Sequence, residues 1–203
     1  MNPPRFSILY ADPPWQFKAR RSYAQPEAAG RSTPYPTMNT EAICSLRVTE
    51  LAEPDCLLFL WATYPMLPQA FDVVRAWDFQ FKTVAFTWVK RTRSDRGFHF
   101  GMGYWSRANP EICLLATRGH PRRRSACVPN LVISPIREHS RKPDEIRERI
   151  VSLCGDLPRA ELFARENTPG WSVWGNEVVN DFTLSQRTDT QPTPRASTWA
   201  EGL

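Results

Sequence analysis

The chain has 203 residues, a formal net charge of +5 at pH 7 and 41% hydrophobic residues. That length suffices for one well-buried α/β domain and is short for two. We find no signal-peptide pattern and no apolar run near the roughly 18 residues of a membrane span, so we expect a soluble cytoplasmic protein without a membrane partner. The five cysteines are odd in number and lack CxxC spacing, which argues against disulfides and a metal site.

The first predicted element is a buried strand over residues 6–11 that ends in Asp12-Pro13-Pro14-Trp15. The run is apolar, with aromatic and β-branched residues, and the two prolines cannot continue a sheet ladder. Ligands bind at the carboxyl ends of the strands in an open α/β sheet. We therefore place these four residues at the working edge of the sheet.

The same four residues suit a planar group that carries an NH2. The Asp12 carboxylate and the Pro13 carbonyl are acceptors that can hold both amine hydrogens, and Trp15 can cover the ring by stacking. This grip directs the amine lone pair at an electrophile and stabilises the positive charge that grows on nitrogen. The alternative is an ordinary turn, with the aspartate capping a loop and the tryptophan in the core.

Residues 16–38 show no hydrophobic periodicity and include Arg20 and Arg21. A long insertion without periodicity inside a compact domain is usually functional, so we predict an active-site lid. The pattern then predicts a helix from residue 39, a strand over 56–61, a helix over 68–77 and a strand over 79–89.

A second long loop is expected over residues 90–110, basic at first and then rich in glycine and aromatic residues. Bases that are extruded from a duplex or lie in single strands are held by such aromatic and arginine combinations. Aromatic residues under a loop are also ordinary core, and we leave that alternative open. Strands are expected over 111–117 and 127–133.

Arginine accounts for 22 of the 26 basic residues, and most of these arginines cluster in predicted loops. Its planar fork suits phosphate oxygens, so loops that converge on one edge would form a nucleic-acid surface. The alternative is a set of solvated loops. The candidates for nucleic-acid binding are Arg20, Arg21, Arg91, Arg93, Tyr104, Trp105, Arg122, Arg123, Arg124 and Arg137.

Two further segments carry polar groups next to predicted elements. Pro143 followed by two acidic residues marks the start of a helix, so the basic loop over 134–142 ends at the positive end of a helix, which favours an anion. A charged helix cap is the alternative. Strands over 160–163 and 171–174 then bracket a polar loop whose side chains can bind hydroxyls or a carboxylate.

Four segments, in this order, resemble the adenine amino-methyltransferases related to the catalytic subunit of the eukaryotic messenger-RNA adenosine methyltransferase. This MT-A70-like family includes bacterial and phage DNA adenine methyltransferases. The motif at residues 12–15 is similar to its catalytic motif, and the Asp and Trp favour adenine. Residues 139–145 resemble the loop over the cofactor, and residues 161–165 and 171–176 resemble two elements of the cofactor pocket.

The resemblance implies S-adenosylmethionine as cofactor, with Lys142 on its carboxylate. A carboxylate at Glu177 can accept hydrogen bonds from the ribose hydroxyls. Ala164 and Glu166 depart from the family pattern, which has Gly and often Pro or His there, and Glu177 stands where Gln is frequent. The implied catalytic residues are Asp12, Pro13, Pro14 and Trp15. The implied cofactor-binding residues are Asp12, Lys142, Arg165, Asn167, Asn176 and Glu177.

The likeness covers residues 6–178 and implies one Rossmann-like methyltransferase domain over residues 1–180. The expected fold is α/β, with about seven mostly parallel strands, helices on both faces and the catalytic motif before the cofactor motif, as in permuted members. The absence of GxGxxG argues against a nicotinamide enzyme. Few apolar residues follow residue 179, so 181–203 is expected to be a flexible tail.

We therefore expect transfer of a methyl group from S-adenosylmethionine to the N6 amine of adenine, in DNA first and in RNA second. Two alternatives come from other classes: a catalytically silent nucleic-acid-binding subunit, and a methyltransferase for protein or small-molecule amines. A homodimer and a separate partner subunit both stay open.

Overall fold

The computed structural model describes residues 4–16, 36–101, 105–138 and 141–187. Its centre is a seven-stranded sheet in the order β5-β3-β4-β2-β1-β6-β7. Four of the six strand pairings are parallel, and β4 runs antiparallel to both of its neighbours. The strands are β1 (Phe6–Ala11), β2 (Ala52–Ala62), β3 (Gln80–Arg91), β4 (Glu111–Arg118), β5 (Leu131–Pro135), β6 (Arg159–Leu162) and β7 (Ser172–Trp174).

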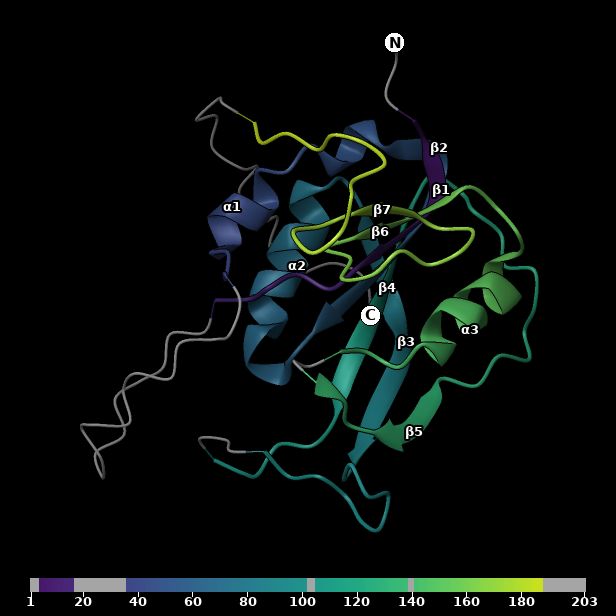
Figure 1. Ribbon diagram of the computed structural model, residues 1–203. Coiled ribbons are helices and arrows are strands. Elements are labelled where there is room, and N and C mark those ends of the chain that lie inside the picture. Colours follow the sequence, from purple (N-terminus) through teal and green to yellow (C-terminus); the bar gives the residue numbers. More distant parts are fainter. Residues whose placement is uncertain (1–3, 17–35, 102–104, 139–140, 188–203) are drawn as a thin grey trace, which may run out of the picture.

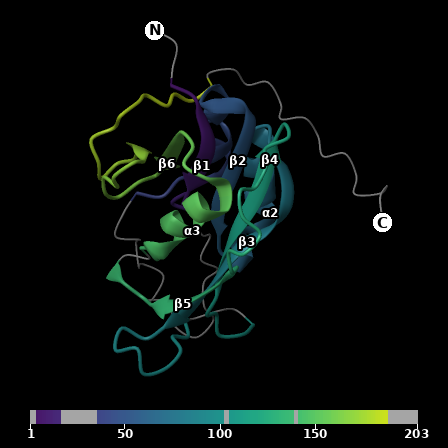
Figure 2. The same cartoon turned by 90° about the vertical axis from the view of Figure 1, so that its right-hand side faces the viewer.

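Helices cover both faces of the sheet (Figures 1 and 2). Helices α1 (Thr40–Cys44) and α2 (Leu67–Ala76) lie on one face, and α3 (Glu145–Cys154) lies on the other. Short 3₁₀ helices, Val48–Glu50 and Tyr64–Met66, precede β2 and α2. The predicted fold class, an α/β Rossmann-like domain with mostly parallel strands and helices on both faces, is confirmed.

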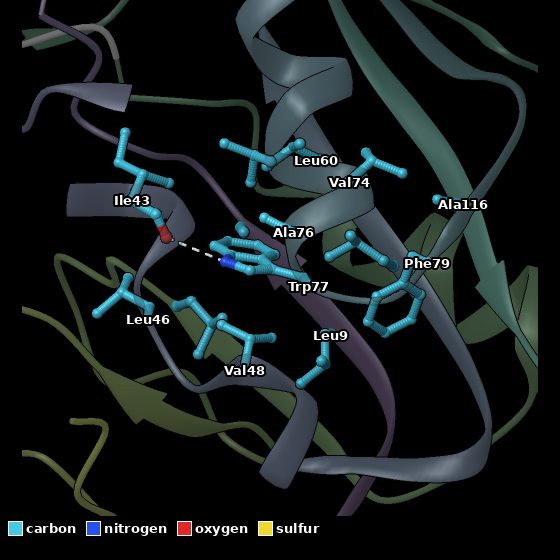
Figure 3. Packing of buried hydrophobic residues seen from close by; sticks show 14 of the residues in the cluster. Leu9, Ile43, Leu46, Val48, Leu60, Val74, Ala76, Trp77, Phe79 and Ala116 are labelled. Carbon is cyan, nitrogen blue, oxygen red and sulfur yellow. Dashed lines mark hydrogen bonds between the residues drawn. The ribbon is translucent and has the colours of Figure 1, made fainter. Parts of the chain in front are cut away.

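The core on the α1 and α2 face is built around Trp77, which is fully buried (Figure 3). Its indole nitrogen donates a hydrogen bond to the carbonyl of Ile43 at 3.0 Å, which joins the end of α2 to α1. Asp78 follows with a φ of 64°, a left-handed conformation that aspartate tolerates better than most residues. Helix α2 therefore ends at this point.

The core on the α3 face uses the alternate residues of the strands. Ile8 and Tyr10 of β1 point to this face, whereas Leu9 and Ala11 join the core on the other. Ile146 of α3 is fully buried against the sheet. Two-sided burial explains why residues 8–11 form a continuous apolar run.

The direction of each strand defines two edges of the sheet. We call the edge where β1, β2, β3 and β5 end and β4 begins the front edge, and the opposite one the back edge. Ala11 pairs with Leu60 of β2 and with Leu162 of β6, and Ala62 pairs with Ile112 of β4. Asp12 and the loop after β5 therefore start at the front edge.

Two predicted boundaries shift. The strand expected over 127–133 begins later, at Leu131, since Pro129 has no N–H for the ladder. The tail expected from residue 181 is packed at its start: Phe182 and Leu184 are buried, and the amide of Arg187 donates to the Ser45 carbonyl at 2.7 Å. The remaining tail residues, 188–203, lie outside the described part of the chain.

None of the helices in the described ranges is long and apolar enough to cross a membrane.

Candidate active site

Asp12-Pro13-Pro14-Trp15 forms a tight turn at the front edge. The amide of Trp15 donates to the Pro13 carbonyl at 2.8 Å, which leaves this carbonyl one further lone pair. The amide of Met38 donates to the Pro14 carbonyl at 2.8 Å, and the amide of Gln16 donates to the Met38 carbonyl at 3.1 Å. The two ends of the predicted lid thus meet at the motif, while its residues 17–35 lie outside the described ranges.

Trp15 belongs to the core and lines the site. Its side chain is 5% exposed, and its indole nitrogen donates to the carbonyl of Trp61 at 3.1 Å. The indole nitrogen of Trp61 in turn donates to the hydroxyl of Tyr10 at 2.8 Å. These bonds between β1, the turn and β2 fix the walls of the site through groups that carry no charge.

Charged side chains form an alternating chain across the same edge. Lys142 Nζ lies 2.8 and 2.7 Å from the two carboxylate oxygens of Asp12, a residue 130 positions away in the sequence. It also lies 3.2 Å from Glu111 Oε2, and Glu111 Oε1 lies 2.5 Å from Lys90 Nζ. The charges of two acidic and two basic side chains therefore compensate one another in a largely buried part of the site.

Burial sets the charge states of this chain. Burial raises the pKa of Asp12, although Lys142 pulls it down and only partly offsets the effect. Burial also acts to raise the pKa of Glu111, but Lys142 and Lys90 together hold it below its usual value. Burial acts to lower the pKa of Lys142, and the two carboxylates outweigh it, so the pKa is raised and this lysine stays charged.

A first cavity of about 60 Å³ lies beside the proline turn, and we call it the proline cavity. Its walls include two proline rings, two indole rings and several hydrogen-bond acceptors, a suitable environment for a flat ring with an NH2 group. It is lined by Asp12, Pro13, Pro14, Trp15, Trp61, Ala62, Thr63, Glu111, Lys142 and Arg165.

A second cavity of about 30 Å³, the ion-pair cavity, lies next to it. Asp12, Lys142 and Arg165 line both cavities, so the Asp12–Lys142 ion pair forms part of the wall between them. The remaining lining residues are Tyr10, Arg141, Arg147, Glu161, Phe163 and Glu166.

The ion-pair cavity is held together by salt bridges. Arg147 donates to both oxygens of Glu161, at 2.7 and 2.9 Å, in the fork geometry that guanidinium and carboxylate favour. Arg141 Nη2 lies 2.6 Å from both oxygens of Glu166. Burial raises the pKa of Glu161 even though Arg147 opposes it. This side of the site is charged, whereas the walls around the proline cavity are mostly neutral.

The loops after β6 and β7 lie against each other. A Cβ on Gly175 would fall 2.1 Å from the carbonyl oxygen of Ala164, so only glycine allows this contact. The contact brings the Arg165 guanidinium within 3.9 Å of the Glu177 carboxylate. Asn167, Asn176 and Glu177 are exposed and line neither cavity, and their role toward a cofactor stays a prediction.

Part of the segment expected as a loop over 90–110 is a hairpin in which Arg91 pairs with Phe98, and we call residues 90–100 the front-edge hairpin. The amide of Thr92 donates to the Gly97 carbonyl at 2.8 Å, and Arg91 lies over the ring of Phe98 at 5.8 Å. Phe98 and Phe100 are about half exposed, and Trp105 is fully exposed. Arg91 and Arg93 lie here at the front edge, whereas Arg20, Arg21 and Tyr104 fall outside the described residues.

The arginines do not all converge on the front edge. Because β4 is antiparallel, it ends with Arg118 at the back edge, and Arg122, Arg123 and Arg124 follow it there. The amide of Arg124 donates to the Leu153 carbonyl near the end of α3. The expectation of a single arginine surface therefore fails for these three residues.

Arg137 is at the front edge, but it is engaged within the loop after β5. Its guanidinium donates to Asp144 and to the carbonyl of Lys142, each at 2.6 Å. It therefore supports the position of Lys142.

Sequence reasoning missed Trp61, Thr63, Glu111 and Glu161, which line the two cavities. Thr63 directly follows β2, so its place at the front edge could have been predicted from the end of a strand in the same way as that of Asp12. Glu111 is at the start of a strand, and its place in the site depends on the antiparallel direction of β4, which the pattern did not reveal.

Comparison of the sequence with known proteins points to one family. The MT-A70 family model matches residues 6–177. The type II methyltransferase M.MunI of Mycoplasma sp is 30% identical over 192 residues, which cover 87% of this chain and 79% of that protein. The N(6)-adenosine-methyltransferase catalytic subunit METTL3 of Homo sapiens is 26% identical over 178 residues, which cover 86% of this chain and 28% of that protein.

An N(6)-adenosine-methyltransferase MT-A70-like protein of Arabidopsis thaliana is 28% identical over 176 residues, covering 85% of this chain and 24% of that protein. The chain thus spans about a quarter of the length of these eukaryotic relatives.

Proposed function

The chain belongs to the MT-A70 family, and we propose that it transfers a methyl group from S-adenosylmethionine to the exocyclic N6 amine of adenine in DNA. One observation carries the proposal. Asp12 directly follows β1 in a turn formed by prolines and a tryptophan, and it pairs with Lys142 at the wall between two cavities. The site thus has one cavity suited to a ring with an amine and, beside it, one suited to a charged molecule.

Asp12 would orient the amine. A carboxylate has about four lone-pair positions, so the two contacts to Lys142 leave acceptor capacity on both oxygens. The Pro13 carbonyl offers its second lone pair from a fixed backbone. Acceptors on the amine hydrogens direct the nitrogen lone pair and stabilise the positive charge that develops on nitrogen during transfer.

The residues of the ion-pair cavity fit S-adenosylmethionine. Lys142 and Arg165 suit a carboxylate, and Glu161 and Glu166 supply negative charge near an ammonium or sulfonium group. Asn176 and Glu177 would serve the ribose hydroxyls. When bound, this cofactor supplies an electrophilic methyl group on sulfur. The protein's own part is to hold the two reactants in line and to exclude water.

DNA is the substrate we propose first, since the chain matches a type II methyltransferase over most of that protein's length. RNA is the second candidate, because relatives that carry the name N(6)-adenosine-methyltransferase match the same domain. The front-edge hairpin, with exposed aromatic rings and arginines, suits either nucleic acid. A silent subunit is disfavoured, as Asp12 and the proline carbonyls are in place.

The test is methyl incorporation from labelled S-adenosylmethionine into unmethylated duplex DNA, single-stranded DNA, RNA and protein, side by side. We expect incorporation into DNA that disappears in Asp12→Ala. Incorporation into RNA alone would move the proposal to the second candidate. Incorporation into protein alone, or none into any nucleic acid, would contradict it.

A further inference from the structure

Thr63 is the first residue after β2 and lines the proline cavity together with Asp12 and Trp61. It caps the 3₁₀ helix Tyr64–Met66 with extended backbone angles, but its side chain makes no capping hydrogen bond. Its hydroxyl oxygen is buried and has no hydrogen-bond partner within the described ranges. Buried polar groups are nearly always paired, so this hydroxyl requires an explanation.

Other donors around the proline cavity already have partners. The indole nitrogens of Trp15 and Trp61 donate to a carbonyl and to the Tyr10 hydroxyl. Lys142 donates to Asp12 and Glu111, and the Arg165 guanidinium lies 3.9 Å from the Glu177 carboxylate. The two prolines have no N–H. Thr63 therefore brings an uncommitted neutral hydroxyl to a cavity whose other polar walls mostly accept hydrogen bonds.

A site for adenine needs both hydrogen-bond acceptors and a hydrogen-bond donor. Its N6 amine donates two hydrogens, and the ring nitrogens N1 and N7, on either side of the amine, accept. Asp12 and the Pro13 carbonyl would take the amine, and a hydroxyl nearby would donate to one ring nitrogen. Guanine presents a carbonyl oxygen where adenine has the amine, and that oxygen would face the acceptors of Asp12 and Pro13 unpaired.

We propose that Thr63 helps to bind the target base by donating its hydroxyl hydrogen to a ring nitrogen of the target adenine. The proposal rests on the function proposed above and names a contact to the base beyond its amine. Rotation about χ1 changes the direction of the hydroxyl without moving the backbone. A site built to form such a bond rejects bases that cannot complete it.

The first arm of the test compares two substitutions. Thr63→Val keeps the shape and removes the hydroxyl, and Thr63→Ser keeps the hydroxyl. We expect Thr63→Val to raise the KM for the nucleic acid that the wild type methylates, so that kcat/KM falls about tenfold, while Thr63→Ser stays near wild type. The cofactor Kd and the thermal midpoint of Thr63→Val should stay at wild-type values, which shows that the fold and the ion-pair cavity are intact.

The second arm uses substrates with 1-deazaadenine or 7-deazaadenine in place of the target adenine. One of the two analogues should lower kcat/KM of the wild type about as much as Thr63→Val lowers it on adenine. The same analogue should not lower kcat/KM of Thr63→Val any further. Equal activity of wild type and Thr63→Val on adenine, or equal losses with both analogues in the two proteins, would overturn the proposal. A wild type that binds S-adenosylmethionine but methylates no adenine would instead overturn the proposed function.

Discussion

The front and back edges of the sheet both carry ion pairs, but the pairs differ in their surroundings. At the front edge the side chains of Lys142 and Asp12 are 10% and 22% exposed. At the back edge the Arg159–Asp156 pair has a carboxylate side chain that is 86% exposed. Water screens the second pair, whereas the first holds its charges in a low-dielectric site.

This difference shows that clusters of basic residues in the sequence do not identify the functional edge. The edge that we propose as functional is the one where Asp12 follows β1, Glu111 begins β4, and both carboxylates lie against Lys142. If this account is correct, substitutions at the front edge change methyl transfer, and matched substitutions at the back edge leave it unchanged.

The largest effect is expected for Asp12→Ala. Removal of the carboxylate deletes the acceptor that orients the amine and stabilises its developing charge, so kcat should fall by about 10³-fold. S-adenosylmethionine binding, measured by calorimetry, should stay within a few-fold of wild type. Asp156→Ala at the back edge is the matched control. Near-normal turnover by Asp12→Ala would refute the assignment of the site.

The exposed arginines of the two edges should also differ in how much they contribute to nucleic-acid binding. Arg93→Gln/Arg96→Gln removes two charges from the front-edge hairpin and leaves Arg91, which packs on Phe98, in place. We expect nucleic-acid affinity to fall roughly 10- to 30-fold and the slope of log K against log salt to decrease by about 2.

The control for the arginines is Arg122→Gln/Arg123→Gln, which removes the same charge from the back edge. Binding is measured by fluorescence anisotropy over a salt series. An equal loss in both double variants would mean that net charge, rather than position, governs binding.

The pH dependence of turnover distinguishes a carboxylate at the front edge from one at the back edge by the direction in which its removal moves the acid limb. Asp12 must be ionised to accept from the amine, and burial raises its pKa, so turnover should fall with decreasing pH through a value above the ordinary aspartate pKa of about 3.9. The Glu111 carboxylate contributes to this raised pKa. Glu111→Gln should therefore move the acid limb of kcat to lower pH.

The profile is recorded at saturating cofactor, with Glu53→Gln, near the start of β2, as the matched substitution. An acid limb that moves to higher pH in Glu111→Gln, or that moves equally in both variants, would show that the two front-edge carboxylates do not interact as described.

The smallest effect is expected for the Arg141–Glu166 pair, whose side chains are 39% and 36% exposed. The pair joins the loops after β5 and β6, next to Lys142 and Arg165. Exposed pairs contribute little, so Arg141→Gln and Glu166→Gln should each weaken cofactor binding only about two- to threefold, with the double variant no worse than either. High salt should remove the difference in cofactor affinity between the wild type and the variants. Losses of affinity that add up in the double variant would contradict a direct interaction between the two side chains.

Much of the fold could be predicted from local pattern. Residues 8–11 of β1 are apolar because both faces of the strand are buried, and the prolines that follow cannot continue the strand. The position of Asp12 at the end of a strand could therefore be predicted from the sequence. Lys142 is 130 positions from Asp12. The resemblance implied a contact of Lys142 with the cofactor, and its ion pair with Asp12 is known only from the structure.

The rest depended on strand direction and on packing at a distance. The antiparallel β4 brings Glu111 into the site and carries Arg122 to the back edge, and no periodicity encodes that direction. Phe182 lies in a polar, tail-like sequence, yet its ring packs 5.4 Å from that of Phe6, a contact between the two ends of the domain. Composition cannot reveal such a contact.

The most direct measurement is the identity of the product. Nucleic acid is incubated with the protein and with S-adenosylmethionine that carries a trideuterated methyl group, then digested to nucleosides and analysed by mass spectrometry. We predict that the deuterated methyl group is found on N6 of adenine and that it is absent when Asp12→Ala replaces the wild type. Label on the cytosine N4 amine, or adenine label undiminished in Asp12→Ala, would contradict it.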